Sequence, residues 1–268
     1  MKTSRIKSIV IVILLLVNAF LLVLLLGRRS QQRIAYERSV EQLSLLLSSN
    51  GIAFDTSLLP NTVSFPAAEL SHDTDAEAAF ARALLGDDAA VRSTGSGSSV
   101  YESEHGSLRF RASGEIDGSI NRSTEDPFEF LRSILSDFGY QLYANISALS
   151  ITGSGTLAAV REMDETKIFN APLIFTFESG TLVSVSGSFL PSVTLTKSAD
   201  GMDAISALVR FLDYRNTNGL VCTQIIHLEN GYLLQSAAVS PKLVPAWHIM
   251  TDVSEYYVNS VTGEISRE

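Results

Sequence analysis

The segment Val244-Pro245-Ala246-Trp247-His248-Ile249 decides the fold prediction, because Ala171-Pro172-Leu173-Ile174-Phe175 resembles it earlier in the chain. In each, a proline leads into an apolar run that is typical of a strand. The two prolines also follow the starts of predicted helices at similar distances, about 45 and 42 residues. The pattern predicts an α+β fold in which two related units each combine a helix with an antiparallel sheet.

Outward from these segments, alternating apolar and polar residues predict strands on both sides. The predicted strands are 107–113, 116–121, 156–163, 172–178, 181–189, 220–228, 232–239, 246–251 and 255–260. Asn230-Gly231 is a strong hairpin signal and predicts a turn between two of them. Helices are predicted to begin near Asp73, Asp126-Pro127 and Asp203, because aspartate caps the first turn of a helix.

At the N-terminus, Ile9 to Leu26 forms an apolar run of 18 residues with Asn18 near its middle. A helix of that length spans about 27 Å, close to the hydrocarbon core of a bilayer. A cleaved signal peptide is the alternative, but the run is longer than a signal core and Gly27-Arg28-Arg29-Ser30 offers no small-x-small cleavage site. We therefore predict a single-pass membrane protein with a cytoplasmic N-terminus and an extracytoplasmic C-terminal domain.

A stripe of Tyr36, Val40, Leu43 and Leu47 follows, at the spacing of one helix face. The stripe could dock on the chain's own folded region, or it could form a stalk that pairs with another helix; we favour docking. The predicted organisation is a cytoplasmic tail (1–8), a transmembrane helix (9–26), a juxtamembrane helix and linker region (27–99), a first α+β unit (100–192) and a second unit (193–268).

Charge argues against nucleic acid as a partner. The chain has 20 basic and 29 acidic residues, and every acidic residue lies after Arg33. A surface this acidic repels a phosphate backbone.

No motif for catalysis, for a metal or for a cofactor is present in the sequence. The four histidines lack the spacing of metal ligands, and the strand residues His227 and His248 are expected to be surface or satisfied core residues. Cys222 lies in an apolar stretch and is expected to be a buried, inert thiol. We therefore predict a protein that is not an enzyme.

The beginning and the end of the chain resemble a known family. The stretches Ser4-Arg5-Ile6-Lys7-Ser8-Ile9 and Leu16-Val17-Asn18-Ala19-Phe20-Leu21-Leu22 look like the opening of the YycI branch of the YycH/YycI regulatory proteins of Gram-positive bacteria. The segment 244–249, followed by Tyr256-Tyr257-Val258-Asn259-Ser260-Val261-Thr262-Gly263-Glu264-Ile265, resembles the end of the same family and, more broadly, PepSY-like modules.

The resemblance implies a non-enzymatic, membrane-anchored regulator of a WalK-type two-component sensor histidine kinase that controls cell-wall metabolism. It implies a YycH-like companion as a second partner. It also implies that the membrane helix, with Asn18 and Phe20, contacts the kinase. A polar amide within a bilayer gains from a hydrogen-bond partner on another helix, although a strongly apolar helix also tolerates one asparagine without a partner.

A PepSY-like module allows a second hypothesis. In it the chain is an extracytoplasmic inhibitor or chaperone that binds a protease or a peptide along an open sheet edge. The strand with Tyr256, Tyr257, Val258 and Asn259 would then be the contact.

Overall fold

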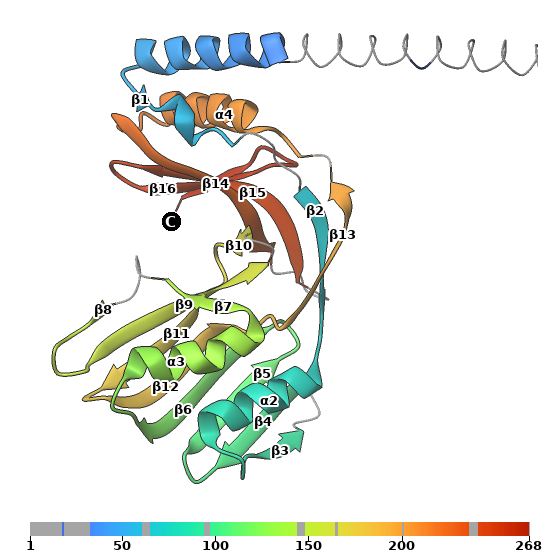
Figure 1. Cartoon of the computed structure of the whole chain (residues 1–268), viewed down its shortest axis with the longest axis vertical. Helices are drawn as coiled ribbons and strands as arrows, with labels where there is room; N and C mark the ends of the chain where they lie inside the picture. The colour runs from blue at the N-terminus through green and yellow to red at the C-terminus, as the bar shows by residue number, and fades with distance from the viewer. Residues whose placement is uncertain are drawn as a thin grey trace, which may run out of the picture.

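The fold is built mainly from strands. The computed structural model describes residue 18 and residues 33–60, 65–93, 97–143, 148–163, 166–199, 201–235 and 241–267. Seventeen strands in these ranges pair into one connected system. The pairings divide it into two sheets, A and B, which β9 joins. Figure 1 shows sheet A above and sheet B below, with β2 and β13 running along one side between them.

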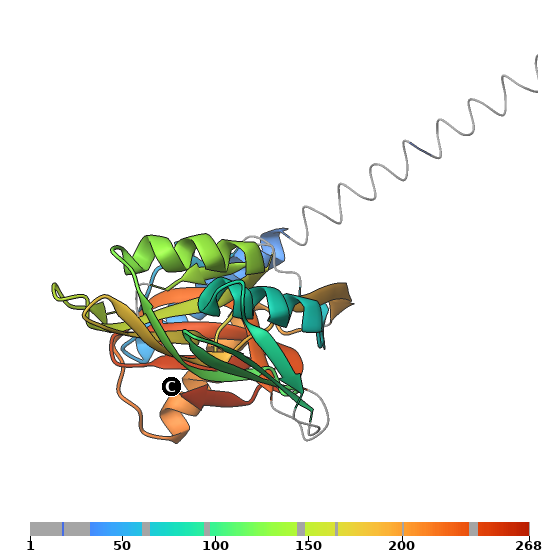
Figure 2. The same ribbon diagram turned by 90° about the horizontal axis from the view of Figure 1, so that it is seen from below.

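Sheet B is antiparallel and runs in the order β3-β4-β5-β6-β12-β11-β9, with β7 and β8 along the other side of β9. Its strands are β3 (Ala90–Ser93), β4 (Ser98–Ser103), β5 (Gly106–Arg111), β6 (Glu115–Ser123), β7 (Tyr140–Leu142), β8 (Ala148–Leu149), β9 (Gly155–Met163), β11 (Leu173–Glu178) and β12 (Thr181–Ser188). Two helices, α2 (Thr74–Leu85) and α3 (Pro127–Leu135), cover one face, as Figure 2 shows. The 3-10 helix η2 (Ser136–Phe138) follows α3.

Sheet A is mixed, because β1 and β10 pair in parallel with β14 while its other pairings are antiparallel. Its strands are β1 (Ala53–Phe54), β2 (Phe65–Ser71), β10 (Thr166–Ile168), β13 (Ser192–Ala199), β14 (Gln224–Gln235), β15 (Lys242–Thr251), β16 (Glu255–Asn259) and β17 (Ile265–Arg267). One face packs on α4 (Ala204–Thr217), and a helix over residues 33–49 lies alongside α4. The 3-10 helix η1 (Thr56–Leu58) follows β1.

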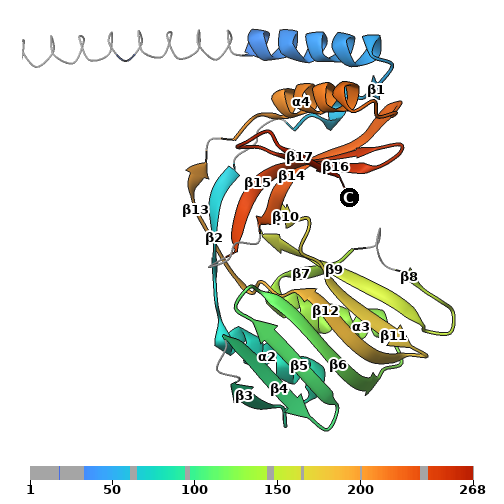
Figure 3. The same ribbon diagram turned by 180° about the vertical axis from the view of Figure 1, so that it is seen from behind.

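Sheet B and its helices form a unit inserted into the sequence of sheet A, and Figure 3 shows the two parts from behind. We call residues 74–163 and 173–188 the inserted unit, and residues 33–71 and 192–267 the terminal unit. Three connections join the units, namely β2 to α2, β12 to β13, and the loop from β9 through β10 to β11. A separate apolar cluster lies at these connections and consists of Met163, Ile168, Ala171, Leu190, Tyr232 and Leu243. We call these three connections the junction, and it thus has its own apolar core.

Several local predictions are confirmed. The carboxylates of Asp73, Asp126 and Asp203 accept hydrogen bonds from backbone N–H groups in the first turns of α2, α3 and α4. Strands β9, β11 and β12 lie where alternation predicted them. Most of the stripe on helix 33–49 packs against α4 and sheet A, where Leu43 and Leu47 are buried and Val40 is partly buried, whereas Tyr36 is 42% exposed.

The predicted turn at Asn230-Gly231 is wrong, because both residues lie inside the continuous strand β14. Gly231 serves packing instead of chain reversal. A Cβ atom there would lie 2.4 Å from the ring of Phe169 and 2.5 Å from the carbonyl oxygen of Lys167. The glycine therefore lets β10 and the residue after it approach β14 closely.

The predicted fold class is also wrong. The chain does not consist of two separate helix-plus-antiparallel-sheet units, because its strands form one connected and mixed system. The physical reason is that β9 extends beyond sheet B into a hairpin with β10, which then adds in parallel to the edge of β14. The predicted limits of the domains stay predictions.

The predicted single-pass membrane location is contradicted as well. In the part of the chain that the structure describes, no helix is both long enough and apolar enough to cross a bilayer. The predicted transmembrane segment 9–26 lies outside the described residues except for Asn18.

Docking of helix 33–49 can be tested with two leucines. Leu47 is fully buried, whereas the side chain of Leu45 on the same helix is 64% exposed. Leu47→Ala should lower the free energy of unfolding by about 2–5 kcal/mol, because it leaves a cavity. Leu45→Ala makes the same chemical change at an exposed position and should stay within about 0.5 kcal/mol of the parent. Urea unfolding followed by circular dichroism measures both; equal effects would contradict the docking.

Candidate functional site

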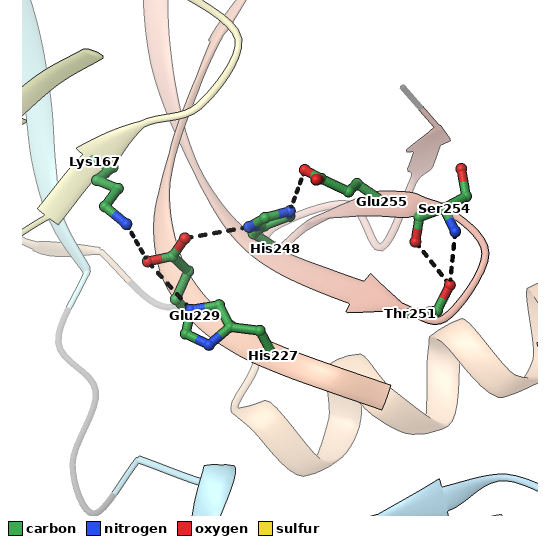
Figure 4. A network of polar contacts seen from close by, with 7 residues as sticks. All are labelled: Lys167, His227, Glu229, His248, Thr251, Ser254 and Glu255. Carbon is green, nitrogen blue, oxygen red and sulfur yellow. Dashed lines mark hydrogen bonds and ion pairs between the residues drawn. The ribbon is translucent and has the colours of Figure 1, made fainter. Parts of the chain in front are cut away.

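A polar cluster lies on the face of sheet A that is turned away from α4. Successive residues of β15 point to opposite faces, so Trp247 and Ile249 pack in the core with α4 while His248 points the other way. Glu229 of β14 is paired with His248 across the sheet, and Glu255 comes from the start of β16. Figure 4 shows these side chains converging, with Lys167 reaching them from β10.

His248 lies between two carboxylates. Its Nδ1 is 3.2 Å from Glu229 Oε1, and its Nε2 is 2.9 Å from Glu255 Oε2. Lys167 Nζ donates to the other oxygen of Glu229 at 2.9 Å, and His227 Nε2 lies 3.6 Å from that same oxygen. Glu229 therefore connects three strands of sheet A.

Aromatic rings enclose the imidazole. The ring of Tyr257 stacks on His248 at 4.9 Å between centroids, and the ring of Phe169 lies at 5.2 Å. The side chain of His248 is 2% exposed. Phe169 follows β10, and its ring fits against β14 because Gly231 has no side chain.

The geometry fixes how many protons the histidine needs. A neutral imidazole has one N–H donor and one acceptor nitrogen, whereas a carboxylate has acceptors alone. With both carboxylates ionised, His248 can donate to Glu229 and Glu255 together when both ring nitrogens carry a proton. Lys167 and the doubly protonated His248 then balance the charges of the two carboxylates.

The environment keeps Glu229 ionised. Burial alone would raise the pKa of this carboxyl group, but hydrogen bonds from His248 and Lys167 outweigh it and lower the pKa to about 2. For Lys167, burial favours the neutral amine, yet the hydrogen bond and the charge of Glu229 raise the pKa overall. The ring of Tyr143, 5.4 Å from the Lys167 ammonium, adds a cation–π contact.

A second polar group lies where β2 leads into α2. Asp73 caps α2 and also accepts a 2.6 Å hydrogen bond from the hydroxyl of Ser192, the first residue of β13. Nearby, burial raises the pKa of Glu77, one oxygen of which lies 3.2 Å from His72 Nδ1. This group ties together two of the three connections between the units.

Strand β16 lies inside sheet A, and its predicted role as a peptide contact stays a prediction. Tyr256, Tyr257, Val258 and Asn259 are all buried. Their strand pairs with β15 on one side and with β17 on the other.

The other predicted contact residues lie near the N-terminus. Asn18 is helical and exposed, and Phe20 lies outside the described residues. Their roles as partner contacts stay predictions.

Sequence reasoning described the histidines correctly but missed the cluster. His248 is a satisfied core residue and His227 is half exposed, as expected. Cys222 is buried, and burial raises the pKa of its thiol, as expected for an inert cysteine. Glu229, Glu255 and Lys167 were missed, because a turn at Asn230-Gly231 removes Glu229 from the strand that faces His248. A continuous strand through residue 235 is the signal that would have placed Glu229 opposite His248.

Two pockets lie near the junction. One of about 570 Å³ lies between α3 and β7 and includes Arg132, Gly139 and Glu162 in its lining. The other, of about 290 Å³, borders Tyr257 and Arg267. The lining of neither includes His248. In the described ranges, no three His, Cys, Asp or Glu residues group as metal ligands.

Comparisons with known proteins give a structural likeness and no sequence match. No family model matches the chain, and no curated protein matches it. The solved structure of YycH from Bacillus subtilis is similar over 78% of this chain and 53% of that chain, with a TM-score of 0.41 and 15% sequence identity. The chain thus spans about half the length of that structure. A likeness of this strength assigns neither family nor function.

The low pKa of Glu229 predicts a specific acid sensitivity. Its unfolded-state pKa is near 4.5 and its folded-state pKa is about 2, so unfolding takes up a proton between these values and stability falls as the pH falls through that window. The difference corresponds to about 3 kcal/mol. Glu229→Gln should therefore reduce the loss of stability between pH 5 and pH 2 by a similar amount.

The matched control is Glu178→Gln, at an exposed position of β11. Unfolding in urea at a series of pH values measures both variants. The assignment fails if Glu178→Gln flattens the acid side of the profile as much as Glu229→Gln does.

Proposed function

We propose that this chain is a non-enzymatic regulator of a WalK-type two-component sensor histidine kinase that controls cell-wall metabolism. It acts by protein–protein contact and works together with a YycH-like companion. The sequence resemblance at the two ends of the chain supports this proposal.

One observation carries the proposal further. The terminal segments that resemble the YycI branch, 244–249 and 256–265, fold together as β15, β16 and the turn into β17. Within them, Trp247 is fully buried and its indole N–H donates to the carbonyl of Met202 at 2.9 Å. The same segments supply His248 and Tyr257 to the polar cluster around Glu229. Residues that resemble the end of the family therefore contact Phe169, in the segment that leads from β10 back to the inserted unit.

Regulation of this kind needs no chemistry. A partner that binds one of two kinase states more tightly shifts the balance between them by its differential affinity. Each 1.4 kcal/mol of preference, approximately, changes the ratio of the two states tenfold. An acidic two-unit body with a stable frame can supply such a preference through surface contacts.

The proposal predicts an effect on kinase output in a purified system. Adding the full chain to the reconstituted sensor kinase should change its rate of autophosphorylation in a saturable way. The YycH-like companion should increase the apparent affinity. If neither the rate nor the affinity changes when the chain is present in excess, the regulator proposal is wrong.

The predicted contact at Asn18 can be separated from general effects on folding. Asn18→Leu should weaken the effect on the kinase severalfold and leave the thermal unfolding midpoint unchanged, because Asn18 is exposed. As a control, Gln42→Leu replaces an exposed amide at a different place, on helix 33–49, and should leave the effect on the kinase intact. Equal behaviour of the two variants would argue against a specific role for Asn18.

A further inference from the structure

We propose that His248 is a proton-operated anchor for the inserted unit, which is held firmly when the imidazole carries two protons and loosely when it carries one. The proposal concerns the junction and does not depend on the identity of a partner. Imidazole is the side chain whose charge ordinarily changes between about pH 5 and pH 8. A buried imidazole that needs both protons to satisfy its neighbours makes the contacts around it depend on pH.

Loss of one proton leaves the site unsatisfied. Nitrogen Nδ1 faces Glu229 and Nε2 faces Glu255, at 3.2 Å and 2.9 Å. After deprotonation, one nitrogen presents a lone pair to a carboxylate, so that contact becomes repulsive. The cluster also gains a net negative charge in a place where the His248 side chain is 2% exposed.

Phe169 links the charge of the imidazole to the attachment of the inserted unit, because residue 169 lies in the segment that leads from β10 back into that unit. This residue lies between β10 and β11, and its ring is 5.2 Å from the imidazole. A cationic ring is attracted to aromatic faces, and the attraction ends when the charge is lost. The attraction between the imidazole and the Phe169 ring therefore weakens whichever carboxylate the neutral imidazole releases.

The other groups around the imidazole do not replace the lost proton. Glu229 and the exposed His227 come from β14, Glu255 and Tyr257 from β16, and Lys167 from β10. Lys167 is already committed to Glu229 and to the ring of Tyr143. Among these groups, the proton on His248 is the one that completes the contacts with both Glu229 and Glu255.

Amide hydrogen exchange on the full chain tests the anchor. The Phe169 N–H donates to the carbonyl of Tyr232 at 2.9 Å and reports the attachment of β10 to β14. After correction for the intrinsic effect of pH, its protection factor should fall about tenfold from pH 6 to pH 8, the change expected when one charge-assisted hydrogen bond is lost. The Thr124 N–H, bonded to Gly180 in the inserted unit, should change little.

Two variants assign the effect to His248. Glu255→Gln provides an amide that can donate to a neutral Nε2, so the pH dependence at Phe169 should disappear while the fold is retained. His227→Gln is the matched control, because His227 is 46% exposed and lies 3.6 Å from Glu229. His227→Gln should keep the full pH dependence. So should His72→Gln, which changes the histidine beside Glu77 where β2 leads into α2.

Nitrogen-15 chemical shifts of the His248 ring supply a second measurement. We expect the change from two protonated ring nitrogens to one to follow the same pH dependence as the protection of Phe169. The proposal is overturned if the ring carries one proton at both pH values, if protection at Phe169 does not change with pH, or if His227→Gln removes the change while Glu255→Gln keeps it.

Discussion

One carboxylate, that of Glu229, holds the junction of this protein together. It accepts from Lys167 on β10 and faces His248 on β15, and it is itself part of β14. Ionised groups in a buried site are stable when each has an oppositely charged partner and its hydrogen bonds are made. The arrangement of sheet A on one side and the inserted unit on the other depends on these bonds and on the apolar cluster beside them.

Contacts at all three connections hold the two units in one arrangement. Asp73 bonds to Ser192 where two connections meet, and Phe169 fills the space over Gly231 at the third. The Asp73–Ser192 hydrogen bond is directional, and the fit of Phe169 over Gly231 is close, so together these contacts favour one arrangement of the two units. A regulator that works by shape benefits from such a defined frame.

Much of the fold could be predicted from local patterns. Alternation placed β9, β11 and β12, and aspartate caps placed three helix starts. The predictions that failed concern features that are decided by tertiary contacts. Asn230-Gly231 has the composition of a turn, but packing of Phe169 against the glycine selects an extended strand. Parallel addition of β10 to β14 joins residues far apart in sequence, so no local pattern reveals it. The cluster was missed for the same reason.

The central claim, that Glu229 couples β10 to β15, is tested most directly by a double-mutant cycle. Lys167→Met and His248→Gln each remove one partner of Glu229, and the unfolding free energies of the single and double variants give their coupling. The two side chains meet through one carboxylate, so we predict a coupling energy of about 0.5–3 kcal/mol. Additive effects, within about 0.3–0.5 kcal/mol, would contradict the claim.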